Sequence, residues 1–101
     1  MSKVISFINN FKSLHPSAIE ECFSYGNCYW FAKILADRFG GIIYYDEVDN
    51  HFITKIKDTF YDIMGECTID SSCTYPWSKY ILIEPLNASR VYKYCILKES
   101  E

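Results

Sequence analysis

The most constraining feature of the sequence is a helix that is marked at both of its ends. Asn27 is a preferred residue for the position before a first helical turn, and Gly40-Gly41 accepts the left-handed conformation in which helices often end. Between them, an apolar side chain recurs at every fourth position, at Phe31, Leu35 and Phe39. We therefore predict a helix from Cys28 to about Phe39 with one buried face, on which Cys28 also lies.

Three short segments after this helix have the character of β-strands. We predict strands at Ile42 to Tyr45, at His51 to Ile56 and at Phe60 to Met64. In the second strand, one face carries Phe52, Thr54 and Ile56 and the other carries His51, Ile53 and Lys55. Lys57-Asp58-Thr59 is short enough for a tight connection, which makes the second and third strands a hairpin.

The two ends of the chain are predicted to be helical. Val4 to Leu14 shows helical spacing, and Pro16 opens a short second helix that runs to about Phe23. Gly65 to Trp77 is predicted as a long loop, and Tyr80 to Ile83 fits a strand and a helix equally. After Pro85, a final helix is predicted from about Asn87 to Leu97.

These elements predict an α+β fold. N-terminal helices pack on a small antiparallel sheet of three to four strands, and a C-terminal helix completes the structure. With 101 residues, the chain from residue 1 to residue 101 fits a single domain. Half of the residues are apolar and 18% are aromatic, so the chain has the material for a packed core.

Charge and hydropathy argue against several classes of partner. The net charge is −3 and no two Lys or Arg residues are adjacent, so the clustered positive charge of nucleic-acid binding is missing. No apolar run reaches the roughly 20 residues that cross a bilayer, and the first residues turn polar at Asn9-Asn10 before a signal sequence accumulates. We therefore expect a cytoplasmic protein without nucleic-acid or membrane partners, whose five cysteines are reduced.

Cys28 is the candidate nucleophile. A thiol attacks as its thiolate, and the ordinary cysteine pKa of about 8.5 leaves most of it protonated at neutral pH. A helix N-terminus lowers that pKa through unpaired N–H groups and a positive dipole end, and a nearby imidazolium lowers it as well. The helix N-terminus is available to Cys28, because this residue follows Asn27 at the predicted helix start.

His51 is the candidate for the nearby imidazolium, and Asp62 is the candidate for the carboxylate that orients it. His15 lies in a helix-breaking His-Pro pair, whereas His51 opens a strand. With a two-residue turn at Lys57-Asp58, His51 lies opposite Met64 and becomes a diagonal neighbour of Asp62 on one face of the hairpin. A carboxylate in that position holds the tautomer and orientation of an imidazole. A change of one residue in the turn would reverse the arrangement.

The chain resembles the core of papain-like and transglutaminase-like cysteine enzymes in three segments: Gly26-Asn27-Cys28-Tyr29-Trp30-Phe31-Ala32, Asn50-His51-Phe52-Ile53-Thr54 and Phe60-Tyr61-Asp62-Ile63-Met64-Gly65. In that superfamily a cysteine begins a helix packed on an antiparallel sheet, and histidine and aspartate follow on the next two strands. The resemblance implies Cys28 as nucleophile, His51 as base and then acid, and Asp62 as the orienting residue. It also implies an oxyanion site at the Cys28 backbone N–H, helped by Asn27 or Tyr25.

The resemblance covers roughly Gly26 to Gly65 and leaves both ends of the chain unmatched. The chain is much shorter than larger members of the superfamily and shows no evident second wall for a substrate site. The chain also resembles the small proteins found in phages and mobile elements.

Other residues carry weaker signals. Cys67 and Cys73 lack the Cys-x-x-Cys spacing of a zinc site, and there is no glycine-rich phosphate loop, so neither a metal nor another cofactor is expected. An aromatic group either walls a substrate groove or packs the long loop onto the sheet; its members are Tyr75, Trp77 and Tyr80. An acidic group before His51 either favours a basic substrate or is a solvated turn; its members are Asp46, Glu47 and Asp49.

Two functions follow from these patterns. The first is a cysteine-nucleophile hydrolase or acyltransferase that acts on an amide, ester or thioester of a protein or peptide through an acyl-enzyme. The alternative is a non-catalytic binding protein on the same scaffold, for example an inhibitor of a host enzyme. In the alternative, an exposed aromatic surface makes the contact, and the arrangement of Cys28, His51 and Asp62 is vestigial or structural. Cys28 alone also fits a small buried side chain on the Phe31 face, since free cysteine is among the most buried residue types.

Overall fold

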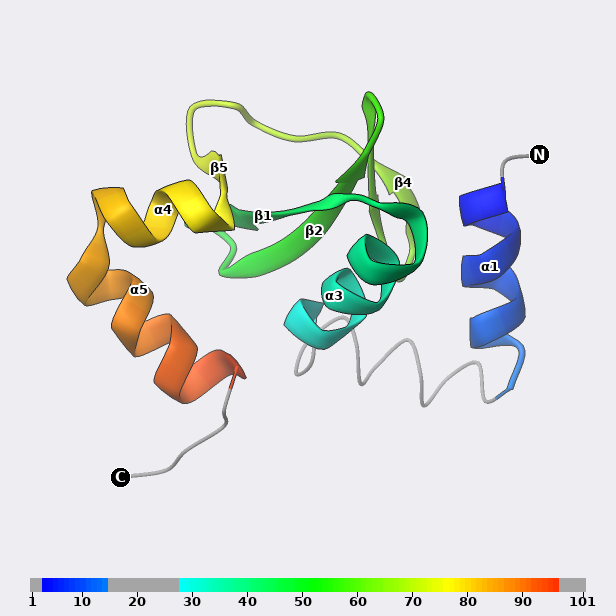
Figure 1. Ribbon diagram of the computed structural model, residues 1–101, viewed down its shortest axis with the longest axis horizontal. Helices are drawn as coiled ribbons and strands as arrows, with labels where there is room; N and C mark the ends of the chain where they lie inside the picture. Colours follow the sequence, from blue (N-terminus) through cyan, green and yellow to red (C-terminus); the bar gives the residue numbers. More distant parts are fainter. Residues whose placement is uncertain (1–2, 15–27, 97–101) are drawn as a thin grey trace.

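A computed structural model describes residues 3–14 and 28–96 of the chain, without the side chains of residues 94 and 95. The predicted helix at Pro16 to Phe23 therefore lies outside the described residues. The elements in chain order are α1 (Lys3–Lys12), α3 (Cys28–Phe39), β1 (Ile42–Asp46), β2 (His51–Ile56), β3 (Thr59–Asp62), β4 (Gly65–Cys67), β5 (Thr74–Pro76), α4 (Trp77–Ile83), α5 (Pro85–Val91) and the π-helical turn η2 (Tyr92–Ile96). Figure 1 shows their arrangement.

The strands form one antiparallel sheet in the order β4-β3-β2-β1-β5. The predicted α+β class is confirmed, but the expectation of three to four strands was too low. The additional strands β4 and β5 have three residues each and lie in the segment Gly65 to Trp77 that was predicted as a loop. Three residues are too few to show alternation, and each strand exists through its pairing with β3 or β1.

Helix α3 lies against β2 on one face of the sheet (Figure 1). Its bounds are the predicted ones, Cys28–Phe39. Gly40 ends the helix with φ +70°, and the N–H groups of Gly40 and Gly41 both donate to the Ala36 carbonyl, at 2.9 and 3.0 Å. Such a left-handed residue satisfies the free carbonyls of a last helical turn, which explains why the glycine pair predicts the helix end correctly.

The hairpin of β2 and β3 has the predicted register. Thr54 pairs with Tyr61, Lys55 with Phe60 and Ile56 with Thr59 around a two-residue turn at Lys57-Asp58. Lys57 adopts a left-handed φ of +57°, as tight hairpin turns require. This register places Asp62 on the same face of the hairpin as His51.

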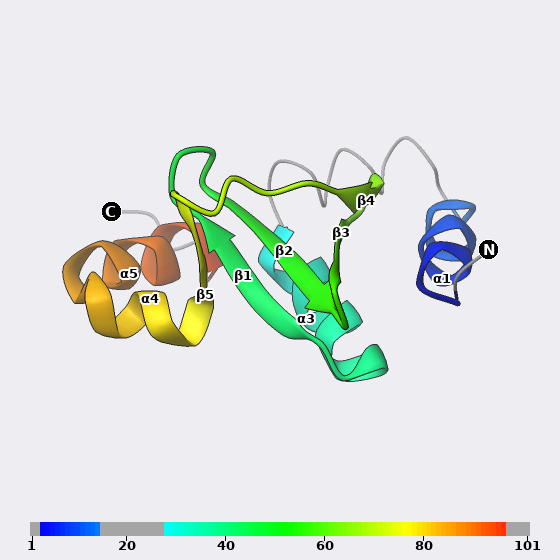
Figure 2. The ribbon, with the colours of Figure 1, turned by 90° about the horizontal axis from the view of Figure 1, so that it is seen from above.

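Two hydrophobic clusters form the core. The aromatic cluster lies toward the C-terminal helices and consists of Ala32, Tyr45, Phe52, Trp77, Tyr80, Ala88, Val91 and Ile96. The aliphatic cluster lies toward α1 and consists of Val4, Ile8, Phe31, Leu35, Ile56, Tyr61 and Ile63. Figures 1 and 2 place α1 and the pair α4–α5 at opposite ends of the molecule, so α3 and β2, which contribute to both clusters, join the two halves.

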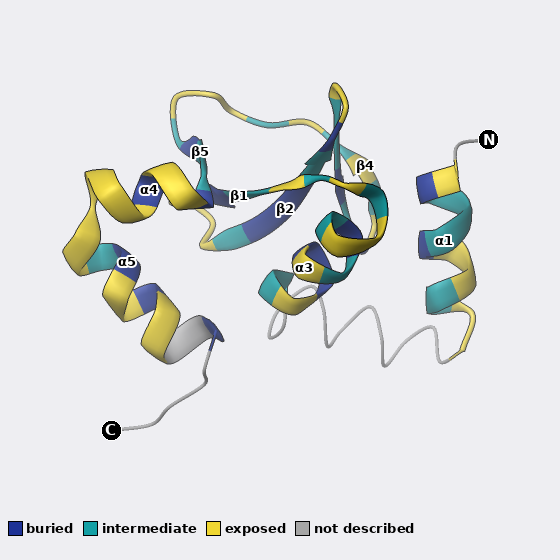
Figure 3. Ribbon diagram, in the orientation of Figure 1, coloured by how far each residue is buried: buried dark blue, intermediate teal, exposed yellow. Residues whose placement is uncertain are grey.

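The C-terminal helices differ from the prediction in their bounds. The ambiguous segment Tyr80 to Ile83 is helical and belongs to α4. The last helix begins at Pro85 rather than Asn87, because proline is suited to a first helical position, and it continues from Val91 into η2. The predicted end at Leu97 lies outside the described residues. The outward sides of α4 and α5 are exposed (Figure 3). Within residues 3–14 and 28–96, no helix has the length and apolar character needed to span a membrane.

Candidate active site

Cys28 is the first residue of α3, at the helix start where the sequence predicts it. Its side chain is partly buried and packs against the aromatic cluster. The N-terminal end of a helix presents N–H groups without intrahelical partners, and these favour a negative charge on a nearby atom. The position of Cys28 in the fold therefore favours its thiolate form.

The start of β2 lies beside this thiol. The pairs between β2 and β3 cover only Thr54 to Ile56, so His51 and Phe52 extend beyond that ladder. The backbone N–H groups of Phe52 and Tyr29 donate hydrogen bonds to the Cys28 sulfur. The Cys28 sulfur therefore lies beside the start of β2, with one backbone donor from β2 and one from α3.

His51 connects Cys28 to Asp62. The Nε2 atom of His51 lies 3.1 Å from Oδ2 of Asp62, and the His51 ring also forms a hydrogen bond with the Cys28 side chain. Because Nε2 faces Asp62, Nδ1 is the ring nitrogen that remains for the hydrogen bond with the Cys28 sulfur. The other Asp62 oxygen, Oδ1, accepts the Met64 N–H at 2.8 Å, which fixes the orientation of the carboxylate. The His51 and Asp62 side chains are 25% and 19% exposed, so both are mostly buried but keep some contact with solvent.

These contacts favour a thiolate–imidazolium pair. Burial raises the pKa of Cys28, but the hydrogen bonds from His51 and the Phe52 and Tyr29 backbones, together with the His51 charge, outweigh burial and lower the net pKa. The hydrogen bond to Asp62, followed by the one to Cys28, raises the pKa of His51 from 6.5 to about 10. Each charged group therefore stabilises the other.

The pair is expected to make folding stability depend on pH, most clearly above pH 9. The stabilisation due to His51, whose pKa is raised, is complete below pH 6.5 and is lost as the pH rises through about 10. The stabilisation due to Cys28, whose pKa is lowered, is complete above pH 9.0 and is lost as the pH falls through the lowered value. Between pH 9.0 and about 10, the folded pair holds one proton, on His51, while the unfolded pair holds none, so the stabilisation falls as the pH rises through this range.

We therefore expect the native chain to exceed a Cys28→Ala/His51→Ala double variant in unfolding free energy by an amount that shrinks as the pH rises from 9 to 10.5. Urea denaturation across this range measures the difference. A difference that grows steadily toward pH 10.5 would contradict an imidazolium in the folded state.

Thr54 connects the two elements that carry the pair. Its side chain is fully buried, and its Oγ1 donates to the Ala32 carbonyl of α3 at 2.8 Å. Ala32 lies one turn after Cys28, and Thr54 lies three residues after His51, so this bond fixes α3 against β2 close to the site. Sequence reasoning did not select Thr54, although a hydroxyl on the otherwise apolar Phe52 face was the available signal, because buried hydroxyls need partners.

Replacing Thr54 with valine removes the hydroxyl and keeps the shape of the side chain. We expect Thr54→Val to lower the unfolding free energy by about 1 kcal/mol and to slow iodoacetamide labelling of Cys28 at pH 6.5 several-fold. The matched control Thr54→Ser keeps the hydroxyl and should retain more of the labelling rate. Equal labelling rates in the two variants would show that the hydrogen bond does not position Cys28.

The other residues selected from the sequence lie in different surroundings. Asn27 and Tyr25 are outside the described residues. Trp77 is 9% exposed and its ring packs against Tyr45 and Phe52, so it belongs to the core while also lining a pocket. Tyr80 is buried in the same cluster, and Tyr75 packs against it.

Within the described residues, Cys67, Cys73 and the acidic turn at Asp46 do not take part in the contacts around the Cys28 thiol. Burial, with the negative charges of Asp62 and Glu66, raises the pKa of Cys67 to about 12. Cys73 donates to Asp46, whose Oδ1 also accepts the N–H groups of Val48 and Asp49 at 3.0 and 3.2 Å. Asp46 therefore stabilises a turn, which favours the structural interpretation of that residue.

Comparison with known proteins gives one match. A family model described as phage YunG-like protein matches residues 7–94, which include Cys28, His51 and Asp62. A search of curated proteins and a search of solved structures each give no match.

Proposed function

The chain belongs to the phage YunG-like protein family, and we propose that it is a cysteine-dependent hydrolase or acyltransferase. The observation that carries the proposal is the hydrogen-bonded series from Cys28 through His51 to Asp62. An activated thiol needs a base within hydrogen-bonding reach and a third group that orients the base. The described part of the chain supplies these three groups from a helix start and two adjacent strands.

The reaction begins with the ion pair. The Cys28 thiolate attacks the carbonyl carbon of an amide, ester or thioester, and a C–S bond forms while the carbonyl oxygen becomes an oxyanion. The backbone N–H of Cys28 at the helix start is the proposed donor to this oxyanion. When the oxyanion collapses, the bond to the leaving group breaks, and the His51 imidazolium donates its proton to that group.

The second half of the reaction releases the acyl group. Neutral His51 accepts a proton from water or from an amine as that molecule attacks the acyl–Cys28 carbonyl. The C–S bond then breaks, and Cys28 leaves as a thiolate beside the restored imidazolium. Water gives hydrolysis and an amine gives acyl transfer, so one site serves both outcomes.

The order of Cys28, His51 and Asp62 along the chain supports a further part of the proposal, that the protein is a minimal papain-like or transglutaminase-like enzyme. A helix that begins at the cysteine and packs on an antiparallel sheet fits that superfamily. Its substrate is proposed to be a protein or peptide in the cytoplasm, where thiols remain reduced.

Trapping the acyl-enzyme tests the proposal. The native chain is incubated with a panel of aryl esters and thioesters at pH 7, and intact-mass spectrometry followed by peptide mapping detects an acyl group on Cys28. The Cys28→Ala variant, which keeps a small side chain at the start of α3, should carry no acyl group. Rapid alkylation of Cys28 without acylation by any compound of the panel would argue against acyl transfer.

A specific observation also favours the alternative of a binding protein. Large apolar side chains on α4 and α5 face solvent, and Leu82 and Leu86 are 81% and 85% exposed. Such exposed groups suit contact with a host protein. If binding alone is the function, the effect of the protein on a host cell persists in Cys28→Ala and is lost in a Leu82→Asp/Leu86→Asp variant; the enzyme predicts loss in Cys28→Ala.

A further inference from the structure

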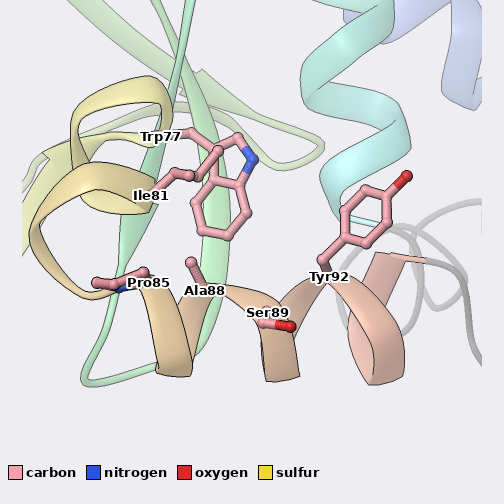
Figure 4. Close-up of a pocket in the computed structure, with 6 residues that line it drawn as sticks. All are labelled: Trp77, Ile81, Pro85, Ala88, Ser89 and Tyr92. Atoms are coloured by element: carbon pink, nitrogen blue, oxygen red, sulfur yellow. The ribbon is translucent and has the colours of Figure 1, made fainter.

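A pocket of about 260 Å³ opens between α4 and α5 (Figure 4). It is lined by Trp77, Ile81, Pro85, Ala88, Ser89 and Tyr92. Figure 4 shows the Trp77 indole ring on one side of the space, with Ala88 beneath it and Tyr92 on the side toward α3. We call this space the Trp77 pocket.

The lining selects for apolar groups. None of the six residues carries a charge, and a charged group that entered the pocket would lose hydration without gaining an ionic partner. The volume lies below the roughly 300–1,000 Å³ of pockets that enclose a whole drug-sized ligand. The pocket therefore suits one aliphatic or aromatic group of a larger molecule.

Trp77 links this pocket to the candidate active site. Its ring packs edge-on against Phe52, with the centroids 5.0 Å apart, and the Phe52 backbone N–H donates to the Cys28 sulfur. Cys28 itself packs against the aromatic cluster, which contains both Trp77 and Ala88 of the pocket lining.

The C-terminal side of the pocket is also attached to α3. Tyr92 begins η2, which contacts α3, and the Trp30 Nε1 atom donates to the Ile96 carbonyl at the end of η2, at 3.1 Å. Trp30 lies two residues after Cys28 in the first turn of α3. The pocket and the thiol are therefore held by the same set of packed elements.

We propose that the Trp77 pocket binds an apolar part of the acyl group that Cys28 attacks. The substrates would then be amides, esters or thioesters whose acyl portion is aliphatic or aromatic rather than charged. This inference rests on the proposed function, because it takes Cys28 as the nucleophile. It adds a substrate class that the arrangement of Cys28, His51 and Asp62 alone does not define.

A series of alkylating reagents tests the pocket separately from turnover. The rate constants of Cys28 labelling at pH 6.5 are compared for iodoacetamide and for N-ethyl, N-hexyl and N-dodecyl iodoacetamide. Burial of two methylene groups is worth about tenfold in affinity, so at least one of the two longer reagents should react at least tenfold faster than iodoacetamide. Labelling by iodoacetamide itself requires no pocket and reports the reactivity of the thiol.

Filling the pocket should remove the advantage of the longer reagents. Ser89 is exposed and lines the pocket, so Ser89→Trp adds a large ring there, with Ser89→Leu as a smaller second variant. Ser78→Trp is the matched control, because Ser78 is an exposed residue of α4 outside the lining. The ratio of N-hexyl or N-dodecyl to unsubstituted labelling should fall toward one in the Ser89 variants and remain high in Ser78→Trp, with folding checked by circular dichroism.

The possible results separate the two proposals. Fast labelling by iodoacetamide with no gain from longer chains would overturn the pocket assignment and leave the proposed function intact. A gain that persists in both Ser89 variants would also overturn the assignment. Iodoacetamide labelling of Cys28 no faster than that of Cys67 would overturn the proposed function, and the pocket assignment with it.

Discussion

Replacing His51 with alanine is expected to slow the alkylation of Cys28 by iodoacetamide at pH 6.5 by about ten- to a hundredfold. Alkylation requires the thiolate, and His51 supplies both a hydrogen bond and a positive charge that favour it. Without His51, burial still raises the pKa of Cys28. A thiol with the ordinary pKa of about 8.5 is only roughly 1% ionised at pH 6.5, so loss of a fully formed thiolate corresponds to a decrease of about a hundredfold.

Peptide mapping by mass spectrometry after timed labelling measures this rate for each cysteine. Cys67 serves as an internal control, because its pKa of about 12 makes it slow to react in the native chain and in the variant alike. His51→Gln keeps a polar side chain without a titratable ring and should behave like His51→Ala. If Cys28 reacts equally fast in the native chain and in both variants, His51 does not activate the thiol.

Replacing Leu35 with alanine is expected to lower the unfolding free energy by about 2–5 kcal/mol. Leu35 is completely buried in the aliphatic cluster, where α3 meets α1 and the sheet. Truncation leaves a cavity that the surrounding residues fill only in part. Because small domains have only about 5–15 kcal/mol of stability in total, this single change removes a large share of it.

Urea denaturation followed by fluorescence measures the change, and Lys33→Ala provides the control on the opposite side of α3. Lys33 is exposed and forms an ion pair with Asp37 at 3.1 Å, and such surface pairs contribute only about 0.3–0.5 kcal/mol. A Leu35→Ala variant that is no less stable than Lys33→Ala would contradict the packing of the aliphatic cluster.

Local signals were sufficient for the parts of the fold that carry the candidate site. The bounds of α3 follow from residues within or next to the helix, so the sequence predicts them correctly. The register of β2 and β3 follows from a two-residue turn and the alternation of strands, and the contact of His51 with Asp62 follows from that register. Both inferences need only short stretches of chain.

The remaining features depend on contacts between distant segments. Strands β4 and β5 are defined by their partners, and three residues carry no periodicity of their own. The donation from the Phe52 backbone to Cys28 depends on where the pairing of β2 and β3 ends, which the side-chain pattern does not encode. The pocket beside Trp77 requires α4 and α5 as separate helices, and the sequence left α4 undecided between helix and strand.

The strand order has a consequence for the path by which the chain folds. The hairpin of β2 and β3 closes through a two-residue turn, and hairpins form within about 1–10 μs. Strand β5, by contrast, reaches β1 only after β2, β3 and β4 have intervened, and long loops close at a greater cost in entropy. During synthesis, α4 and α5 also leave the ribosome after the hairpin. His51 and Asp62 are therefore expected to meet while the wall of the Trp77 pocket is still incomplete, so that the proposed acyl-binding pocket would be completed only at the end of translation.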